Sequence, residues 1–280
     1  MEPTMRRLAM AWMVVLATAL ALCACGRDQG QGDALPAAGN GPATDGTPEP
    51  APVELADVIE RDPRYIIGIS YPPVAREHPG LARLLLAYAD AARAELMQAV
   101  AGLGAEPPTA PYDLSLAFTE VLATPRLVTI AADGSSYTGG AHGNPLLARF
   151  TWLPERDEQL TAARLIPDRA GWKVVSGLAR EQLATALSQR IEGSGYDPAE
   201  RAQLLEGGMQ MIDQGTAPDP ANFAQFEPVV DGSGRIEAIR FVFPPYQVGP
   251  YSDGVQSVEL PAGVLLPLVD PGYRHLFMGG

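Results

Sequence analysis

The sequence predicts an α+β fold, with mixed and largely antiparallel sheets against which helices pack. Some segments alternate apolar and polar residues with the period of half-buried strands. Others repeat apolar residues every three or four positions, as amphipathic helices do. The two kinds of segment do not alternate strictly along the chain, which argues against a doubly wound parallel sheet. The sequence contains no internal repeat.

The first half of the predicted fold holds one helix among four strands. Pro72 and Pro73 end the first strand, because proline cannot continue a central strand. The leucines and alanines of Gly80–Ala101 recur at helical spacing and predict an amphipathic helix. Ser135–Pro145 is expected to be a long hairpin loop between the last two strands. The strands are Tyr65–Tyr71, Tyr112–Thr119, Arg126–Ala132 and Leu146–Trp152.

The second half is predicted to place two helices before three strands. Gly177–Ile191 carries apolar residues at intervals of four, and Pro198 suits the first turn of the next helix, Pro198–Gln214. The turn sequence Asp231–Gly234 joins two of the strands. The strands are Asn222–Val230, Arg235–Phe243 and Val255–Leu260, and a short helix, Pro261–Val269, follows them.

The N-terminus has the pattern of a secretory signal. Two arginines precede an apolar run of about 15 residues, which is too short for a comfortable membrane span. The run ends in LCACG, which resembles the bacterial lipobox because the small Ala24 directly precedes Cys25. We expect residues 1–24 to be a lipoprotein signal peptide and Cys25 to be lipidated; an ordinary secreted protein is the alternative. Gly26 resembles the outer-membrane sorting pattern, so we expect an anchor in the outer membrane that faces the periplasm.

The segment that follows is low in complexity. Residues 25–53 contain almost no large apolar side chain and are rich in glycine, alanine, proline, aspartate and threonine. Such a segment cannot bury a core, so we expect a disordered tether between the lipid and the rest of the chain. The remaining residues suffice for one large domain or two small ones.

Charge and cysteine content exclude several classes of function. The formal net charge is −13, and removal of residues 1–24 takes away two arginines and one glutamate, which lowers it to −14. An acidic surface of this kind repels nucleic acid and attracts cationic partners, so we expect no nucleic-acid binding. Apart from Cys23 and Cys25 the chain has no thiol, and therefore no disulfide, thiolate nucleophile or cysteine metal site in its folded body.

The sequence carries no standard catalytic or cofactor motif. The nucleophile elbow, the zinc-protease helix, the phosphate-binding loop and the dinucleotide fingerprint are all missing. Asp231–Gly234 lacks the further carboxylates of a calcium loop. We therefore expect no catalytic residue, metal or cofactor, although a pair of carboxylates that meets only in three dimensions leaves no local signal.

The run SSYTGGAHGNP, Ser135–Pro145, holds one of only three histidines. Without a second ligand at suitable spacing, His142 is weak evidence for a metal site. Gly139, Gly140 and Gly143 indicate backbone at positive φ or in close contact, where a side chain would clash. Three roles for His142 stay open: a hydrogen bond that holds the loop, contact with a ligand or partner, and catalysis.

A second unusual segment, Phe243–Gly254, contains three prolines and two tyrosines. Stiff loops that present tyrosine are common in recognition surfaces, since the ring gives contact area at a low entropy cost. Tyr246 and Tyr251 are therefore candidate contact residues, together with Tyr137 and His142. The alternative is that both rings of this loop pack on the domain's own core.

Four motifs occur in order along the chain: Ile69–Pro72 before the long helix, Tyr137–His142, Pro218–Phe226 and Pro245–Gly254. Together they resemble a bacterial envelope family with paired domains of unknown function. It includes RsiV-type anti-sigma factors, the N-terminal region of PdaC-type peptidoglycan deacetylases and many lipoproteins. The resemblance implies an N-terminal α+β domain of the PdaC/RsiV type at 54–165. It also implies a C-terminal RsiV-like domain at 166–280 with a β-grasp-type unit.

The resemblance also implies a binding role. RsiV-like ectodomains bind lysozyme, a cationic protein, and an acidic body suits such a partner. This sequence shows no transmembrane helix, sigma-binding segment or deacetylase domain, so neither whole-protein function is expected to carry over. We expect a non-catalytic, lipid-anchored envelope protein that binds a lysozyme-like protein or peptidoglycan. The alternatives are an enzyme or accessory factor acting on peptidoglycan or another cell-wall polysaccharide, and a structural lipoprotein without a soluble ligand.

Overall fold

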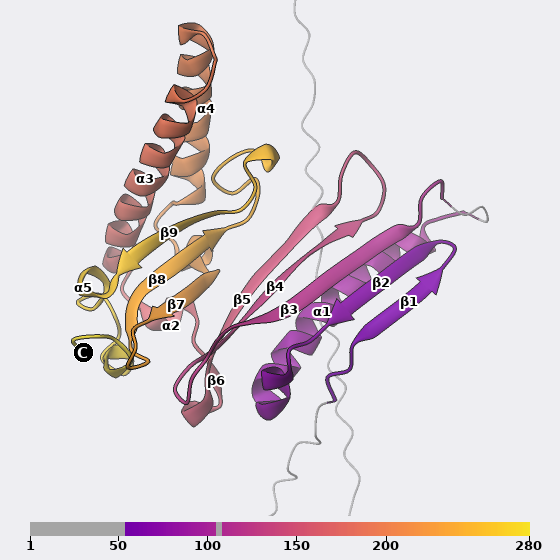
Figure 1. Ribbon diagram of the computed structural model, residues 1–280, viewed down its shortest axis with the longest axis horizontal. Coiled ribbons are helices and arrows are strands. Elements are labelled where there is room, and N and C mark those ends of the chain that lie inside the picture. The colour runs from indigo at the N-terminus through magenta and orange to yellow at the C-terminus, as the bar shows by residue number, and fades with distance from the viewer. Residues whose placement is uncertain (1–53, 105–107) are drawn as a thin grey trace, which may run out of the picture. The chain divides into compact units, whose positions relative to one another are not determined.

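The computed structural model describes residues 54–104 and 108–280 (Figure 1). The expected signal peptide, the lipidation site Cys25 and the tether lie outside these residues. Within them the α+β class is confirmed, because a six-stranded sheet and a three-stranded sheet each occur together with helices. Among the helices of these two ranges, none combines the length and the apolar character that a membrane span requires.

The larger sheet has the strand order β1-β2-β3-β4-β5-β6. Strands β2 and β3 run parallel, because the chain crosses back between them through helix α1 (Pro79–Ala101). Every other neighbouring pair is antiparallel, as the sequence predicts for most of the sheet. The strands are β1 (Val58–Asp62), β2 (Tyr65–Ser70), β3 (Tyr112–Ala123), β4 (Val128–Tyr137), β5 (Asn144–Leu153) and β6 (Glu158–Gln159).

The apolar stripe of α1 packs against this sheet. Leu81, Leu85 and Leu96 are fully buried and share one core cluster with inward-facing residues of the strands, such as Ile67 and Leu116. Burial of one leucine side chain stabilises a fold by roughly 1.5–3 kcal/mol. The helical spacing of these leucines is thus explained by the sheet that they cover.

The second half follows the predicted order of helices and then strands. Helices α2 (Ala162–Leu165), α3 (Arg169–Glu192) and α4 (Pro198–Gly215) precede an antiparallel sheet of β7 (Phe226–Val230), β8 (Ile236–Phe243) and β9 (Gln256–Pro261), and helix α5 (Ala262–Leu265) follows. Single turns of 3-10 helix lie at Pro73–Glu77, Pro154–Arg156, Pro220–Phe223, Tyr251–Asp253 and Arg274–Leu276.

Aromatic rings form the centre of the second core. Phe223 stacks on Trp172 with 5.4 Å between ring centroids and meets Phe241 edge-on at 5.3 Å. Buried Trp172 donates its indole N–H to the carbonyl oxygen of Ile166, 2.9 Å away, so its one polar group is satisfied. The two cores are separate clusters, but the described residues belong to one compact unit. The domain boundary at 165/166 stays a prediction.

Several element boundaries differ from the predicted ones; the last helix, for example, is Ala262–Leu265 and not Pro261–Val269. Helix α3 starts at Arg169, not Gly177, because the Asp168 carboxylate caps it by accepting from the Ala170 N–H. Strand β7 starts at Phe226, not Asn222, because Asp219 caps the 3-10 turn Pro220–Phe223 in the same way. Strand β1 was not predicted: it is a short edge strand, VIERD, whose charged residues interrupt the apolar alternation.

A buried ion pair joins the two sheets. The Arg149 side chain of β5 donates from Nε to Glu227 Oε1 of β7, 2.5 Å away, and the two side chains are only 8% and 10% exposed. The Arg149 backbone N–H also donates to Gln225 Oε1 at 2.7 Å. The second carboxylate oxygen of Glu227 faces Arg240 Nη1 of β8 at 3.3 Å. The contact between the sheets is therefore specified by directional bonds as well as by apolar area.

Replacement of Arg149 by alanine is expected to lower the free energy of unfolding by about 3 kcal/mol, because Glu227 would keep a buried charge with a weaker partner. Urea denaturation measures this loss. The matched control is Arg64→Ala, which breaks the exposed Arg64–Asp62 pair and should cost less than about 1 kcal/mol. Equal losses in the two variants would contradict the importance assigned to the buried pair.

Candidate functional site

Two loops that are distant in sequence meet at three exposed aromatic side chains: His142, Tyr246 and Tyr251, here called the aromatic cluster. His142 lies in the loop between β4 and β5. The tyrosines lie in the loop between β8 and β9, residues 244–255. Three of the four contact residues expected from the sequence thus come together.

The loop between β4 and β5 is shorter than predicted. Ser135 pairs with Pro145 and Ser136 with Asn144, so both strands continue into the run SSYTGGAHGNP and only residues 138–143 form the loop. Gly139 and Gly140 have φ of 99° and 102°, a region that favours glycine, so the loop geometry accounts for both of them. Gly143 does not share this conformation, and a Cβ there would make only ordinary contact, 3.4 Å from Ser135 Cβ.

Both ring nitrogens of His142 have partners. Nδ1 lies 3.0 Å from the carbonyl oxygen of Gly143, which can only accept, so Nδ1 is the nitrogen that carries the proton in the neutral ring. Nε2 then accepts from the Tyr246 hydroxyl, 3.2 Å away. The imidazole also stacks on Tyr251, with centroids 4.2 Å apart and planes at 14°. His142 therefore holds its own loop and joins it to the other loop.

The tyrosine loop is anchored at several points. Tyr246 has a positive φ of 74°, which is uncommon for a residue with a side chain. The tight turn around it is closed by the Gln247 N–H, which donates to the Pro244 carbonyl at 3.1 Å, and the Tyr246 N–H donates to the Gly249 carbonyl at 3.0 Å. Gln247 Nε2 donates to the carbonyls of Gly215 and Asn222. The loop is thus held by its own polar contacts rather than by the rings of its tyrosines.

The tyrosine rings themselves stay accessible. Tyr246 is 54% exposed and Tyr251 is 38% exposed, so the alternative in which both pack on the core is not what the structure shows. An exposed ring that is fixed in place can contact a partner without much further loss of conformational entropy.

Tyr137, the fourth expected contact residue, lies outside the aromatic cluster. It ends strand β4, and its hydroxyl donates to the Gly140 carbonyl at 3.3 Å. Among the described residues, no ring contact joins it to the aromatic cluster. Its position supports the loop that carries His142.

Asp113 lies beside this loop, and its carboxyl group has a shifted pKa that the sequence does not indicate. It pairs across the strands with Tyr137, so the two side chains share one face of the sheet. Burial raises the pKa of the Asp113 carboxyl above its ordinary value. In the sequence it is one polar residue of an alternating strand, because its burial depends on the packing of neighbours from other segments.

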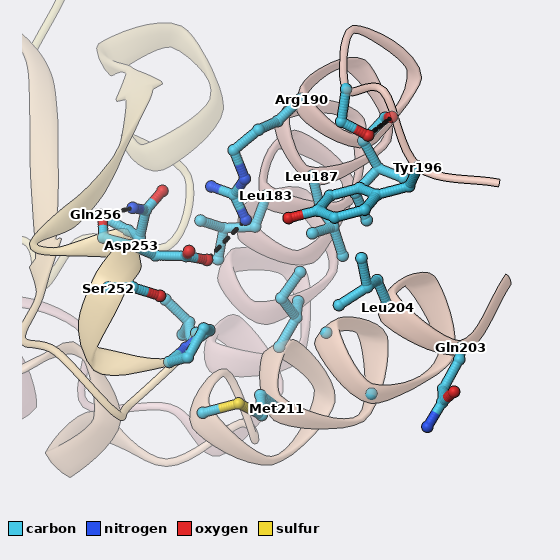
Figure 2. A pocket seen from close by; sticks show the side chains of 18 of the residues that line it. Leu183, Leu187, Arg190, Tyr196, Gln203, Leu204, Met211, Ser252, Asp253 and Gln256 are labelled. Carbon is cyan, nitrogen blue, oxygen red and sulfur yellow. Dashed lines mark hydrogen bonds and ion pairs between the residues drawn. The ribbon is translucent and has the colours of Figure 1, made fainter. Parts of the chain in front are cut away.

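A groove of about 780 Å³ opens next to the aromatic cluster, between helices α3 and α4 and the tyrosine loop (Figure 2). We call it the α3–α4 groove. Its lining includes Leu183, Leu187, Leu204 and Met211, and Arg190 and Asp253 form an ion pair of 2.6 Å at its edge. Pro250 and Ser252, the neighbours of Tyr251, also line it. The sequence could not indicate this groove, because it depends on how two helices and a loop pack together.

The part of the chain that the structure describes shows no group of three or more histidine, cysteine, aspartate or glutamate side chains that could hold a metal ion. The aromatic cluster itself offers one imidazole and two hydroxyl groups. The chemistry that this arrangement supports is stacking, hydrogen bonding and apolar contact with a partner.

The fold and the site thus define an α+β protein with an exposed aromatic cluster whose rings are held by stacking and hydrogen bonds. No family model matches the sequence, and no curated protein matches it. Two solved structures of DUF3298 family proteins are similar. The one from Pseudomonas aeruginosa PAO1 has 17% identity and a TM-score of 0.49, and the match covers 80% of this chain and 94% of that one.

The second structure, from Bacteroides fragilis NCTC 9343, has 15% identity and a TM-score of 0.47, and the match covers 78% of this chain and 93% of that one. At such identities and TM-scores these likenesses carry no function over to this chain.

Two loop variants test how the site is built. Gly140→Ala is expected to lower the free energy of unfolding by about 1–2 kcal/mol, because an alanine at positive φ is strained. His142→Ala is expected to cost about 1 kcal/mol or less, from the lost stack and hydrogen bonds. Thermal unfolding measures both, and Gly195→Ala, in a loop with open space and no positive φ, is the control that should leave stability unchanged. Unchanged stability in both loop variants, with lost partner binding, would show that His142 serves contact rather than support.

Asp113 gives a pH-dependent prediction. Because its pKa is raised in the fold, the folded state binds this proton more tightly than the unfolded chain does, so stability falls as the pH rises from 3.8 through the raised pKa. Asp113→Asn should therefore raise the unfolding temperature at neutral pH and have little effect well below pH 3.8.

The matched control for Asp113 is Asp62→Asn. The pKa of Asp62 is lowered by the backbone and side-chain hydrogen bonds of Arg64, so this substitution should lower the unfolding temperature at neutral pH. The same direction of change in both variants would be evidence against the assigned burial of Asp113.

Proposed function

We propose that this protein is a non-catalytic, lipid-anchored binding module of the cell envelope, and that the aromatic cluster is its contact surface. The observation that carries the proposal is that the stacked rings of His142 and Tyr251 are exposed to solvent and are also fixed in position. His142 and Tyr251 are stacked, Tyr246 is bonded to His142, and both loops have their own anchors. Rigid aromatic side chains are enriched among the residues that dominate binding energies.

The engagement of His142 supports a binding role over a catalytic one. A general base needs a lone pair that reaches the proton it removes. The Nε2 lone pair of His142 accepts from Tyr246, and Nδ1 is bonded to Gly143. Catalysis by this imidazole would first require that one of these bonds break.

The expected partner is a cationic protein such as lysozyme. This expectation rests on the net charge of −13 and on the resemblance of the four sequence motifs to RsiV-type ectodomains. The anchoring rests on the LCACG pattern at Cys25, which favours attachment to the outer membrane with the folded body in the periplasm. Attachment by more than one acyl chain would keep the body at the membrane surface.

Calorimetric titration with lysozyme at low and at moderate salt tests the proposal. We expect binding at low salt that weakens as salt screens the charges. Tyr246→Ala and Tyr251→Ala should each weaken it by about tenfold or more, as expected for aromatic anchors. The control is Ile59→Ala on strand β1, an exposed apolar residue outside the aromatic cluster, which should bind like the wild type. Absence of binding at low salt would overturn the lysozyme assignment.

A second measurement separates binding from catalysis. Peptidoglycan is incubated with the wild-type protein and with His142→Ala, and soluble muropeptides are analysed. We expect no product from either protein. Product that forms with the wild type and disappears with His142→Ala would replace the binding module by an enzyme that acts on cell-wall polysaccharide.

A further inference from the structure

The α3–α4 groove has the form of a binding site that is separate from the aromatic cluster. Its volume of about 780 Å³ lies within the range of natural ligand sites. Leu183, Leu187 and Ile191 follow one another along α3 at intervals of four, and Leu204 and Met211 face them from α4. The line of α3 residues spans about 12 Å, at 1.5 Å per residue. These α3 side chains are 5–7% exposed and form a floor of about two helical turns, while Leu204 and Tyr196, at 43% and 48%, are the more exposed apolar side chains of the groove.

Two neighbouring glycines in α4 differ in their packing. A Cβ at Gly208 would lie 2.6 Å from Leu187 Cδ2, so this glycine lets the two helices approach. Gly207 also lines the groove, but a Cβ there would meet nothing within 4 Å. Glycine inside a helix is unfavourable, and the packing of the described residues gives no reason for this one. A larger side chain at this position would extend into the open space of the groove.

The charges at the rim favour a cationic ligand. The charged residues that line the groove are Glu200, Asp253 and Arg190. Arg190 is already paired with Asp253, so the lining as a whole carries one excess negative charge, on a chain whose net charge is −13. Figure 2 shows Arg190 reaching from α3 towards Asp253 of the tyrosine loop, with Tyr196 and Leu204 farther from that loop. An anionic lipid headgroup would be repelled by this rim.

We propose that the α3–α4 groove binds a cationic amphipathic helix of a partner protein. Such a helix presents apolar side chains at intervals of three and four residues, which can lie between α3 and α4. Lysine or arginine at its edge would lie against Glu200, the lining carboxylate that makes no ion pair among the described residues. The groove would thereby gain a third helix beside α3 and α4. This inference does not depend on the aromatic cluster.

The test uses a fluorescent helical peptide of leucine and lysine and measures its anisotropy with the wild-type protein and with two variants. Gly207→Leu fills the groove, and Ala202→Leu places the same side chain on α4 at an exposed position that does not line it. We expect Ala202→Leu to bind like the wild type, and Gly207→Leu to bind about tenfold more weakly or worse. The wild-type affinity should fall as salt is added.

Two further arms complete the test. Leu204→Ser changes an exposed residue of the groove and should also weaken binding, so the test stands even if Gly207→Leu does not fold. A peptide with glutamate in place of lysine, and dodecanoate as an acyl-chain ligand, should bind more weakly than the lysine peptide. The proposal is overturned if the lysine peptide does not bind, if filling the groove leaves its affinity unchanged, or if the acidic peptide or dodecanoate binds as tightly.

Discussion

The ion pair between Arg149 and Glu227 sets the arrangement on which the candidate site depends. It lies between β5 of one sheet and β7 of the other, where both side chains are nearly out of contact with water. Strand β5 begins at the His142 loop, and β7 pairs with β8, which leads into the tyrosine loop. A charged pair in such a place tolerates little displacement, since its strength depends on good geometry and on satisfied hydrogen bonds. Two loops that are about a hundred residues apart in sequence can therefore meet with their rings stacked.

Within the site, too, polar and backbone contacts hold each segment in place. The backbone of each loop is held by contacts other than the rings: positive-φ glycines in one loop, and the turn at Tyr246 with the bonds of Gln247 in the other. The rings are left to contact each other and the solvent. For the proposed contact with a partner, the conformational entropy cost of fixing the rings is thus met within the folded chain and not in the binding step. The aromatic cluster differs in this respect from a patch of surface tyrosines whose rings are free to move.

The parts of this structure that the sequence could predict are those with a strong local period. The leucines of α1 and the alternation in β3 and β8 define their elements, and the proline-rich Phe243–Gly254 was expected to be a stiff loop between strands. The limits of β4 and α3 were less predictable, because cross-strand pairing decides where β4 ends and a capping aspartate decides where α3 begins. Local sequence shows which residues prefer a strand or a turn. It does not show which residues from other segments will pair with them or pack against them.

Of the site, the sequence indicated residues but not their contacts. His142 and the two tyrosines were expected as candidates, whereas the bond between Nε2 and Tyr246 could not be, because it joins positions 104 apart. Arg149 had no distinguishing feature in its strand, since its partner lies 78 residues further on. The α3–α4 groove and the burial of Asp113 likewise arise only from tertiary packing.

The 3-10 turn Tyr251–Asp253 has a consequence for both surfaces. Tyr251 stacks on His142, while Ser252 and Asp253 line the α3–α4 groove. This short turn therefore contributes residues both to the aromatic cluster and to the groove. A ligand that displaces this turn from the groove side also moves the ring on the other side. By thermodynamic linkage, any resulting change in affinity must be equal in both directions. The turn is therefore the element through which occupation of one surface would be communicated to the other.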